Sequence, residues 1–173
     1  MSIGSDITRT HQHMSEKLDW AARCVDRMIA AKSTNNAIDV QDHFWSFLHA
    51  SRLIWFYLGE FHKSRGDASG TAKTTMNTWT STNLSPAEQR VWDAIANLRT
   101  EDVHTRPVAT EQSSSRALVR RGGKLLRRNG KLCVTKIIKY NVTSGQDDFD
   151  AIDLANRGVG LLRRFVSDFS RLA

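Results

Sequence analysis

The chain has 173 residues, of which 40% are hydrophobic, 25 are Lys or Arg and 18 are Asp or Glu, so its formal net charge is +7. A chain of this length and composition is typical of one soluble domain that buries its own core, and we expect no long disordered tail. The N-terminus has no basic segment followed by an apolar one, and charged residues interrupt the most apolar stretch, so we expect neither secretion nor membrane insertion.

The two cysteines, Cys24 and Cys133, match neither the ligand spacing of a zinc site nor a small disulfide scaffold. We therefore expect a reduced, cytoplasmic protein. We also expect no metal and no cofactor, because the chemistry considered below needs neither.

The positive charge is concentrated in one segment. Between Gln112 and Gln146 there are nine basic residues and no acidic one, whereas the rest of the chain is close to neutral. Lys and Arg bind nucleic acid by displacing condensed counterions, so the segment predicts an anionic partner; the alternative is an ordinary solvated surface. The candidate nucleic-acid-binding residues are Arg116, Arg120, Arg121, Lys124, Arg127, Arg128, Lys131, Lys136 and Lys139.

Two helices are predicted in the first third of the chain. Apolar residues recur at spacings of three and four from about Thr8 to Ala31, and again from Asp39, a possible N-cap, to about Lys63. The second helix carries two apolar stripes about 100° apart. One consists of Phe44, Phe47, Leu48, Ser51, Ile54, Trp55, Leu58 and Phe61, and the other of Trp45, His49, Arg52 and Phe56. Such a helix is either central to its own bundle or shared with a second subunit.

Residues 64–84 change in composition: a Gly- and Ser-containing stretch is followed by a threonine-rich run. We predict a flexible Ser/Thr-rich loop, in which Trp79 packs the segment back onto the body.

A third helix is predicted to begin at Pro86. Ser85 as N-cap, Pro86 at the first helical position and Glu88 at the third form a capping box. Pro107 ends this helix near His104 or Thr105, because the residue before a proline is disfavoured in the helical conformation.

The basic segment is predicted to form a β-hairpin of about residues 115–143. Val and Ile are enriched there, and Asn129-Gly130 suits a two-residue type I′ turn. The helical period returns from Asp147, which predicts a fourth and last helix. The whole chain is thus predicted to be mainly α, a single four-helix bundle over residues 1–173 with an inserted basic hairpin between its third and fourth helices.

The end of the third predicted helix holds the candidate catalytic residues. Arg99 and His104 are separated by four residues near its C-terminus. This pair resembles the R-x4-6-H signature of the HEPN superfamily, whose small helical proteins include many ribonucleases. The resemblance extends to the helix count and to the position of the motif, but the basic hairpin lies outside it. It implies a HEPN-like homodimer, with RNA as substrate, that acts as a bacterial toxin or defence effector and has an antitoxin or defence-system partner.

The chemistry of the pair fits RNA cleavage. Transesterification needs a base for the 2′-hydroxyl proton, an acid for the leaving 5′-oxygen and a cation for the phosphorane. Histidine suits either proton transfer and arginine binds two phosphate oxygens. Positions i and i+5 of a helix are about 140° apart, so Arg99 and His104 converge only if the helix end unwinds or a second subunit contributes. Possible supporting residues are Glu101, Asp102, Thr105 and Arg106.

Three alternatives remain open. His104 can simply cap the helix C-terminus while Arg99 pairs with Glu101 or Asp102. Glu101 and His104 also match half of a di-iron bundle motif, but the sequence holds no second Glu-x-x-His. Finally, the protein can be a non-catalytic adaptor that binds nucleic acid or protein through its hairpin, with Tyr140 stacking on bases.

Overall fold

The computed structural model describes the backbone of most of the chain and a smaller set of side chains. The backbone is described at residues 3–104, 110–118, 120–121, 124–125, 127–128, 131–132 and 134–172. Side chains are described at residues 6–100, 110–115, 137–169 and 171.

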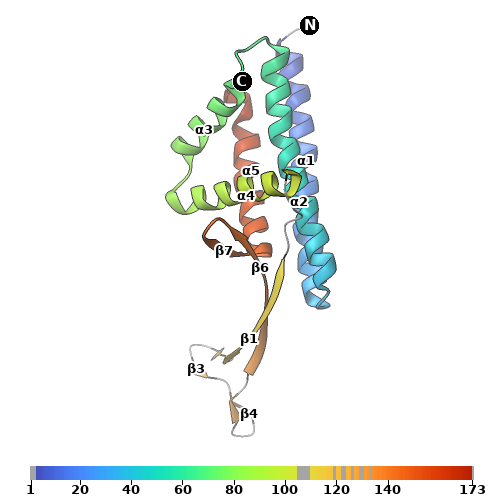
Figure 1. Cartoon of the computed structure of the whole chain (residues 1–173), viewed down its shortest axis with the longest axis vertical. Coiled ribbons are helices and arrows are strands. Elements are labelled where there is room, and N and C mark those ends of the chain that lie inside the picture. Colours follow the sequence, from blue (N-terminus) through green and yellow to red (C-terminus); the bar gives the residue numbers. More distant parts are fainter. Residues whose placement is uncertain are drawn as a thin grey trace.

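The described chain is mainly helical, as predicted, but it contains five helices rather than four. They are α1 (Ile3–Ser33), α2 (Ala37–Ser64), α3 (Thr71–Asn83), α4 (Pro86–His104) and α5 (Ala151–Leu172). The helices α1, α2 and α5 lie lengthwise beside one another, α4 runs across them, and α3 connects the far end of α2 to the start of α4 (Figure 1). None of the described helices is long and apolar enough to cross a membrane.

The core lies where these helices meet. All eight residues of the first α2 stripe are buried, as the sequence predicts. Gly158 of α5 allows the close approach of α4 and α2, because a Cβ at this position would overlap Ile95 Cδ1 and lie 2.9 Å from Phe47 Cζ. A glycine thus permits tight helix packing where a larger residue would not fit.

The predicted flexible loop at residues 64–84 is wrong over most of its length, because α3 occupies Thr71–Asn83. Trp79 is buried against Trp92 and Phe165, and its Nε1 donates to Asp168 Oδ2 at 3.1 Å. The expected packing of Trp79 is confirmed. Threonine has a low helix propensity, so we attribute the stability of α3 to these contacts of Trp79 with the core.

The starts of three helices show how local sequence sets their bounds. The capping box before α4 is present: Glu88 Oε2 accepts from Ser85 N and Oγ, both at 2.8 Å, and Ser85 Oγ accepts from Glu88 N at 3.4 Å. The cap of α2 is Asn36 rather than Asp39, since Asn36 Oδ1 accepts from Asp39 N. Asp150 Oδ1 accepts from the backbone N–H groups of Ile152 and Asp153, so α5 begins at Ala151 rather than at Asp147.

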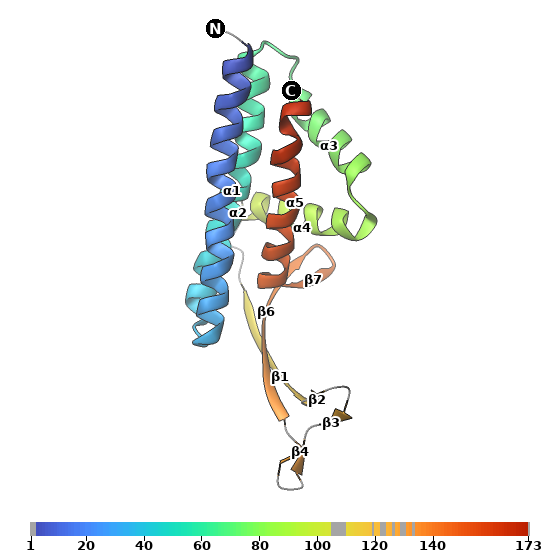
Figure 2. The same cartoon turned by 180° about the vertical axis from the view of Figure 1, so that it is seen from behind.

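The basic segment forms a long antiparallel ribbon. Strand β1 (Glu111–Leu118) pairs with β6 (Val134–Ser144), and β6 pairs in turn with β7 (Asp147–Asp150), which gives a three-stranded sheet in the order β1-β6-β7. The hairpin is therefore wider than 115–143, and the third strand of the sheet, β7, consists of four residues that the sequence predicts to be helical. The ribbon projects away from the helices at the end opposite both termini (Figure 2).

Two short hairpins occupy the distal part of this ribbon. Strand β2 (Arg120–Arg121) pairs with β3 (Lys124–Leu125), and β4 (Arg127–Arg128) pairs with β5 (Lys131–Leu132). The second pairing places Arg128 opposite Lys131, the register that a two-residue turn requires, although the predicted Asn129-Gly130 turn itself lies outside the described residues. The long partner of β6 is β1.

Candidate active site at the end of helix α4

Arg99 lies on the inner side of α4, where this helix crosses α2. Its Cζ atom lies 3.3 Å from the centroid of the Trp55 ring, and its side chain is half-buried. A guanidinium over the face of a tryptophan makes a cation–π contact that is strongest when both groups are removed from water. Trp55 therefore holds the Arg99 guanidinium in place.

No carboxylate among the described side chains pairs with the Arg99 guanidinium. Burial, and secondly the positive charge of Arg52 on α2, lower the pKa of Arg99 to about 10. Arg99 consequently remains charged at neutral pH. Burial and the nearby Arg52 raise the free energy of this charged form, and a bound anion would lower it. Neither Arg52 nor Arg99 makes an ion pair with a residue whose side chain is described.

Trp55 also carries an unused hydrogen-bond donor. The ring is buried and stacks on Trp92 of α4 with centroids 5.0 Å apart. Its Nε1 is buried and has no hydrogen-bond partner among the described residues. A buried N–H without an acceptor is uncommon in proteins, and a bound acceptor would satisfy it.

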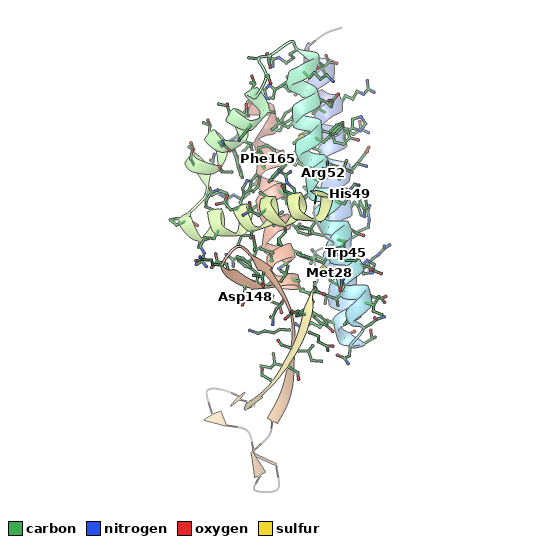
Figure 3. All side chains as sticks on the ribbon, in the orientation of Figure 1. Met28, Trp45, His49, Arg52, Asp148 and Phe165 are labelled. Carbon is green, nitrogen blue, oxygen red and sulfur yellow. The ribbon has the colours of Figure 1, made fainter. Side chains whose placement is uncertain are left out.

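The second α2 stripe faces outward beside this cluster. Trp45 is half-buried, whereas His49, Arg52 and Phe56 are exposed. Figure 3 shows Trp45, His49 and Arg52 following one another along α2, with His49 and Arg52 beside the C-terminal end of α4. His49 also makes an edge contact with Trp20 of α1, with ring centroids 5.7 Å apart.

The helix does not unwind between Arg99 and His104. Because α4 remains helical to His104, the two positions stay about 140° apart around its axis. The side chains of Glu101, Asp102 and His104 lie outside the described ones, and Thr105 and Arg106 lie outside the described residues. Within one chain the two backbone positions therefore lie on different sides of the α4 axis.

The basic residues of the ribbon are spread along its whole length. Lys139 is exposed on β6. Tyr140 is fully buried, which raises the pKa of its hydroxyl, so the expected stacking of Tyr140 on bases is wrong. The other eight basic residues lie in described strands, but their side chains are outside the described set; they are Arg116, Arg120, Arg121, Lys124, Arg127, Arg128, Lys131 and Lys136.

The base of the ribbon is fixed to the helices near the turn between α1 and α2. Gln112 Nε2 donates to Asn35 Oδ1 at 2.6 Å, and Asn35 itself adopts a positive φ of 56° in this turn. Only six residues separate the last residue of α4 from the first of β1, so the two ends lie within roughly 25 Å of each other.

Sequence reasoning did not assign Arg52 and Trp55 to the site. The available signal was an arginine inside an otherwise apolar stripe of α2. The crossing of α4 over α2, which brings Arg99 to that stripe, depends on tertiary packing and has no local sequence signature.

No family model, curated protein or solved structure matches this chain.

Proposed function

We propose that the protein is a metal-independent endoribonuclease of HEPN type, with Arg99 and His104 as its catalytic residues. The observation that carries the proposal is Arg99 itself: a stacked, half-buried guanidinium that stays charged and has no described carboxylate partner, five residues before His104 on α4. A purely structural arginine in this setting would be expected to pair with a carboxylate.

The reaction is an in-line transesterification. A histidine takes the proton of the ribose 2′-hydroxyl, the 2′-oxygen attacks phosphorus, and a second histidine protonates the 5′-oxygen as the P–O5′ bond breaks. The products are a 2′,3′-cyclic phosphate and a free 5′-hydroxyl. Arg99 stabilises the negative charge of the phosphorane through its N–H donors.

A homodimer supplies the second histidine and accounts for the outward α2 stripe. Ile38 and Phe56, 72% and 54% exposed, lie on the same face of α2 as Trp45, His49 and Arg52, within about 60° around the axis. Apolar side chains aligned on one exposed helix face are typical of an interaction surface. A two-fold axis beside this stripe would bring the ends of both α4 helices together, with a His104 from each subunit.

The biological role follows from the HEPN resemblance alone. It places the protein among bacterial toxins or defence effectors that act on cellular RNA and are held in check by an antitoxin or another defence-system protein.

The test is cleavage of labelled RNA in excess EDTA by wild type, Arg99→Ala, His104→Ala and the control Arg163→Ala. Removing an acid–base group lowers the cleavage rate by about 10²–10⁴-fold, and removing a phosphorane-stabilising cation by about 10²–10³-fold. Arg163 is exposed on α5 and makes no ion pair with any described side chain, so its variant should cleave normally.

Circular dichroism and the added variant Arg99→Lys separate catalysis from folding. Lysine keeps the charge but loses bidentate phosphate binding, so Arg99→Lys should fold and cleave slowly. Full activity of folded Arg99→Lys and His104→Ala would contradict the assignment.

A non-catalytic RNA-binding or protein-binding adaptor is the second candidate. The projecting ribbon, whose nine basic residues lie on strands away from the helical core, favours it. An adaptor would bind RNA without turnover and would tolerate both active-site substitutions.

A further inference from the structure

The cluster of Arg52, Trp55 and Arg99 has the composition of a phosphate site. Arg52 and Trp55 are one turn apart on α2, and Arg99 reaches them from α4. Two like charges on adjacent helices repel each other, and no described carboxylate offsets them. Among the described side chains, the fold therefore holds two cations together without a carboxylate counterion.

We propose that Arg52 and Arg99 jointly bind one phosphate group of the RNA backbone, with the Trp55 ring as the floor of the site. This inference rests on the proposed function for the identity of its ligand, and it makes Arg52 a substrate-binding residue that the R-x4-6-H pair does not include. The ligand of this site is a phosphate group, carried either by a phosphate ester such as RNA or by free phosphate.

The stacked Arg99 is suited to this task. Its Cζ atom lies 3.3 Å from the centroid of the Trp55 ring, and its N–H donors have no partner among the described residues, so they are able to bind phosphate oxygens. Because Trp55 already restricts its rotamers, binding costs less side-chain entropy than it would for a mobile arginine. Arg52 is exposed in the single chain, so its side chain can reach the same phosphate at the seam of the proposed dimer.

Trp55 Nε1, which has no hydrogen-bond partner among the described residues, is a second observation that favours a bound acceptor. A phosphate has several acceptor oxygens, and with both arginines occupied one remains for an indole N–H. An anion between the two guanidinium groups would neutralise their repulsion, and it would also satisfy the buried indole donor if one of its oxygens reached Nε1. Burial of an apolar ligand would do neither.

The test uses binding rather than cleavage. The thermal midpoint of the full chain is measured in sodium phosphate and in sodium chloride of equal ionic strength, and binding of a labelled, fully 2′-O-methylated RNA is followed by anisotropy. Such RNA cannot be cleaved through its 2′-oxygen. The proteins compared are wild type, Arg52→Gln and the control Arg163→Gln.

We expect phosphate to raise the midpoint of wild type and of Arg163→Gln but not of Arg52→Gln, because a ligand of the folded state stabilises it. The Arg52→Gln variant should bind the RNA about tenfold more weakly, and the slope of log affinity against log salt should fall by about 1. Arg52 is exposed, so the variant should fold normally.

The outcomes separate this site from the proposed nuclease. Identical behaviour of Arg52→Gln and Arg163→Gln in both assays would overturn the phosphate site even if wild type cleaves RNA. A loss of binding in Arg52→Gln supports the site even if wild type cleaves nothing, which would contradict only the nuclease. A phosphate effect without an RNA effect would identify free phosphate as the ligand.

Discussion

At the scale of single residues, a few side chains account for most of what is specific about this fold. Arg99 and Trp55 form the candidate site through one contact, and Gly158 permits the approach of α4 on which that contact depends. Local sequence reveals a capping serine or a glycine within a helix, but not which distant residue will face it.

Gly158 and Gly160 provide a matched pair for measuring this packing. Gly158→Ala should destabilise the fold by about 1–3 kcal/mol, because the added methyl overlaps Ile95 and Phe47. A Cβ at Gly160 meets nothing within 4 Å, so Gly160→Ala should gain up to about 1 kcal/mol of helix propensity. Urea unfolding of both variants checks the signs, and equal effects would contradict the packing described.

The stability that Glu88 gives to the start of α4 depends on pH. Hydrogen bonds from the backbone and side chain of Ser85 and from Arg164 lower the pKa of Glu88 from 4.5 to about 2. A carboxyl whose pKa is lowered by folding stabilises the protein above its unfolded pKa and loses this contribution as the pH falls through the folded value. The contribution is therefore complete above about pH 5 and disappears towards pH 2.

Thermal unfolding from pH 7 to 2 should show this directly. Glu88→Gln should have a lower midpoint than wild type at pH 7, and the two curves should converge near pH 2. The control is Glu111→Gln, since Glu111 is exposed on β1 and makes no ion pair with any described residue. A difference between wild type and Glu88→Gln that persists unchanged at pH 2 would refute the role given to Glu88.

At the scale of elements, predictions succeeded where the signal was local and failed where partners were distant. The start of α4 at Pro86 follows from its capping box, and the pairing of Arg128 with Lys131 has the register that a two-residue turn requires. The acidic run Asp147–Asp150 resembles a helix N-terminus but is strand β7, because it pairs with the end of β6. Helix α3 was missed because its stability comes from packing rather than propensity.

Trp79 should determine whether α3 stays docked. Trp79→Ala removes the contacts with Trp92 and Phe165 and the hydrogen bond to Asp168, at a cost of about 3–5 kcal/mol. Amide hydrogen exchange should show that α3 loses protection before α1 and α2 do. Thr78→Ala, at an exposed neighbouring position, is the control; equal protection of α3 in both variants would contradict this account.

At the scale of the whole molecule, the outward stripe of α2 and the projecting ribbon define two separate surfaces. The sequence indicated both: the stripe from helical periodicity and the ribbon from its charge. It could not place the stripe beside the end of α4, since this follows from how α4 crosses the other helices (Figure 1).

Phe56→Glu should disrupt the proposed homodimer. A charge at this exposed stripe position opposes burial against a second copy without disturbing the core. Ile29→Glu is the control, since Ile29 is 52% exposed but lies about 180° around α1 from Trp20, the residue that contacts His49. Analytical ultracentrifugation should show monomeric Phe56→Glu, with reduced cleavage, and dimeric Ile29→Glu. A wild type that is monomeric yet active would refute the shared site.

The chemistry of the RNA ends that wild type forms in EDTA distinguishes attack by the 2′-oxygen from attack by water. We expect 2′,3′-cyclic phosphates or their 3′-phosphate hydrolysis products, paired with 5′-hydroxyl ends, and no cutting where the 2′-oxygen is methylated. Cleavage that leaves 3′-hydroxyl and 5′-phosphate ends, or that continues at 2′-O-methylated positions, would contradict it, because water and not the 2′-oxygen would then be the nucleophile.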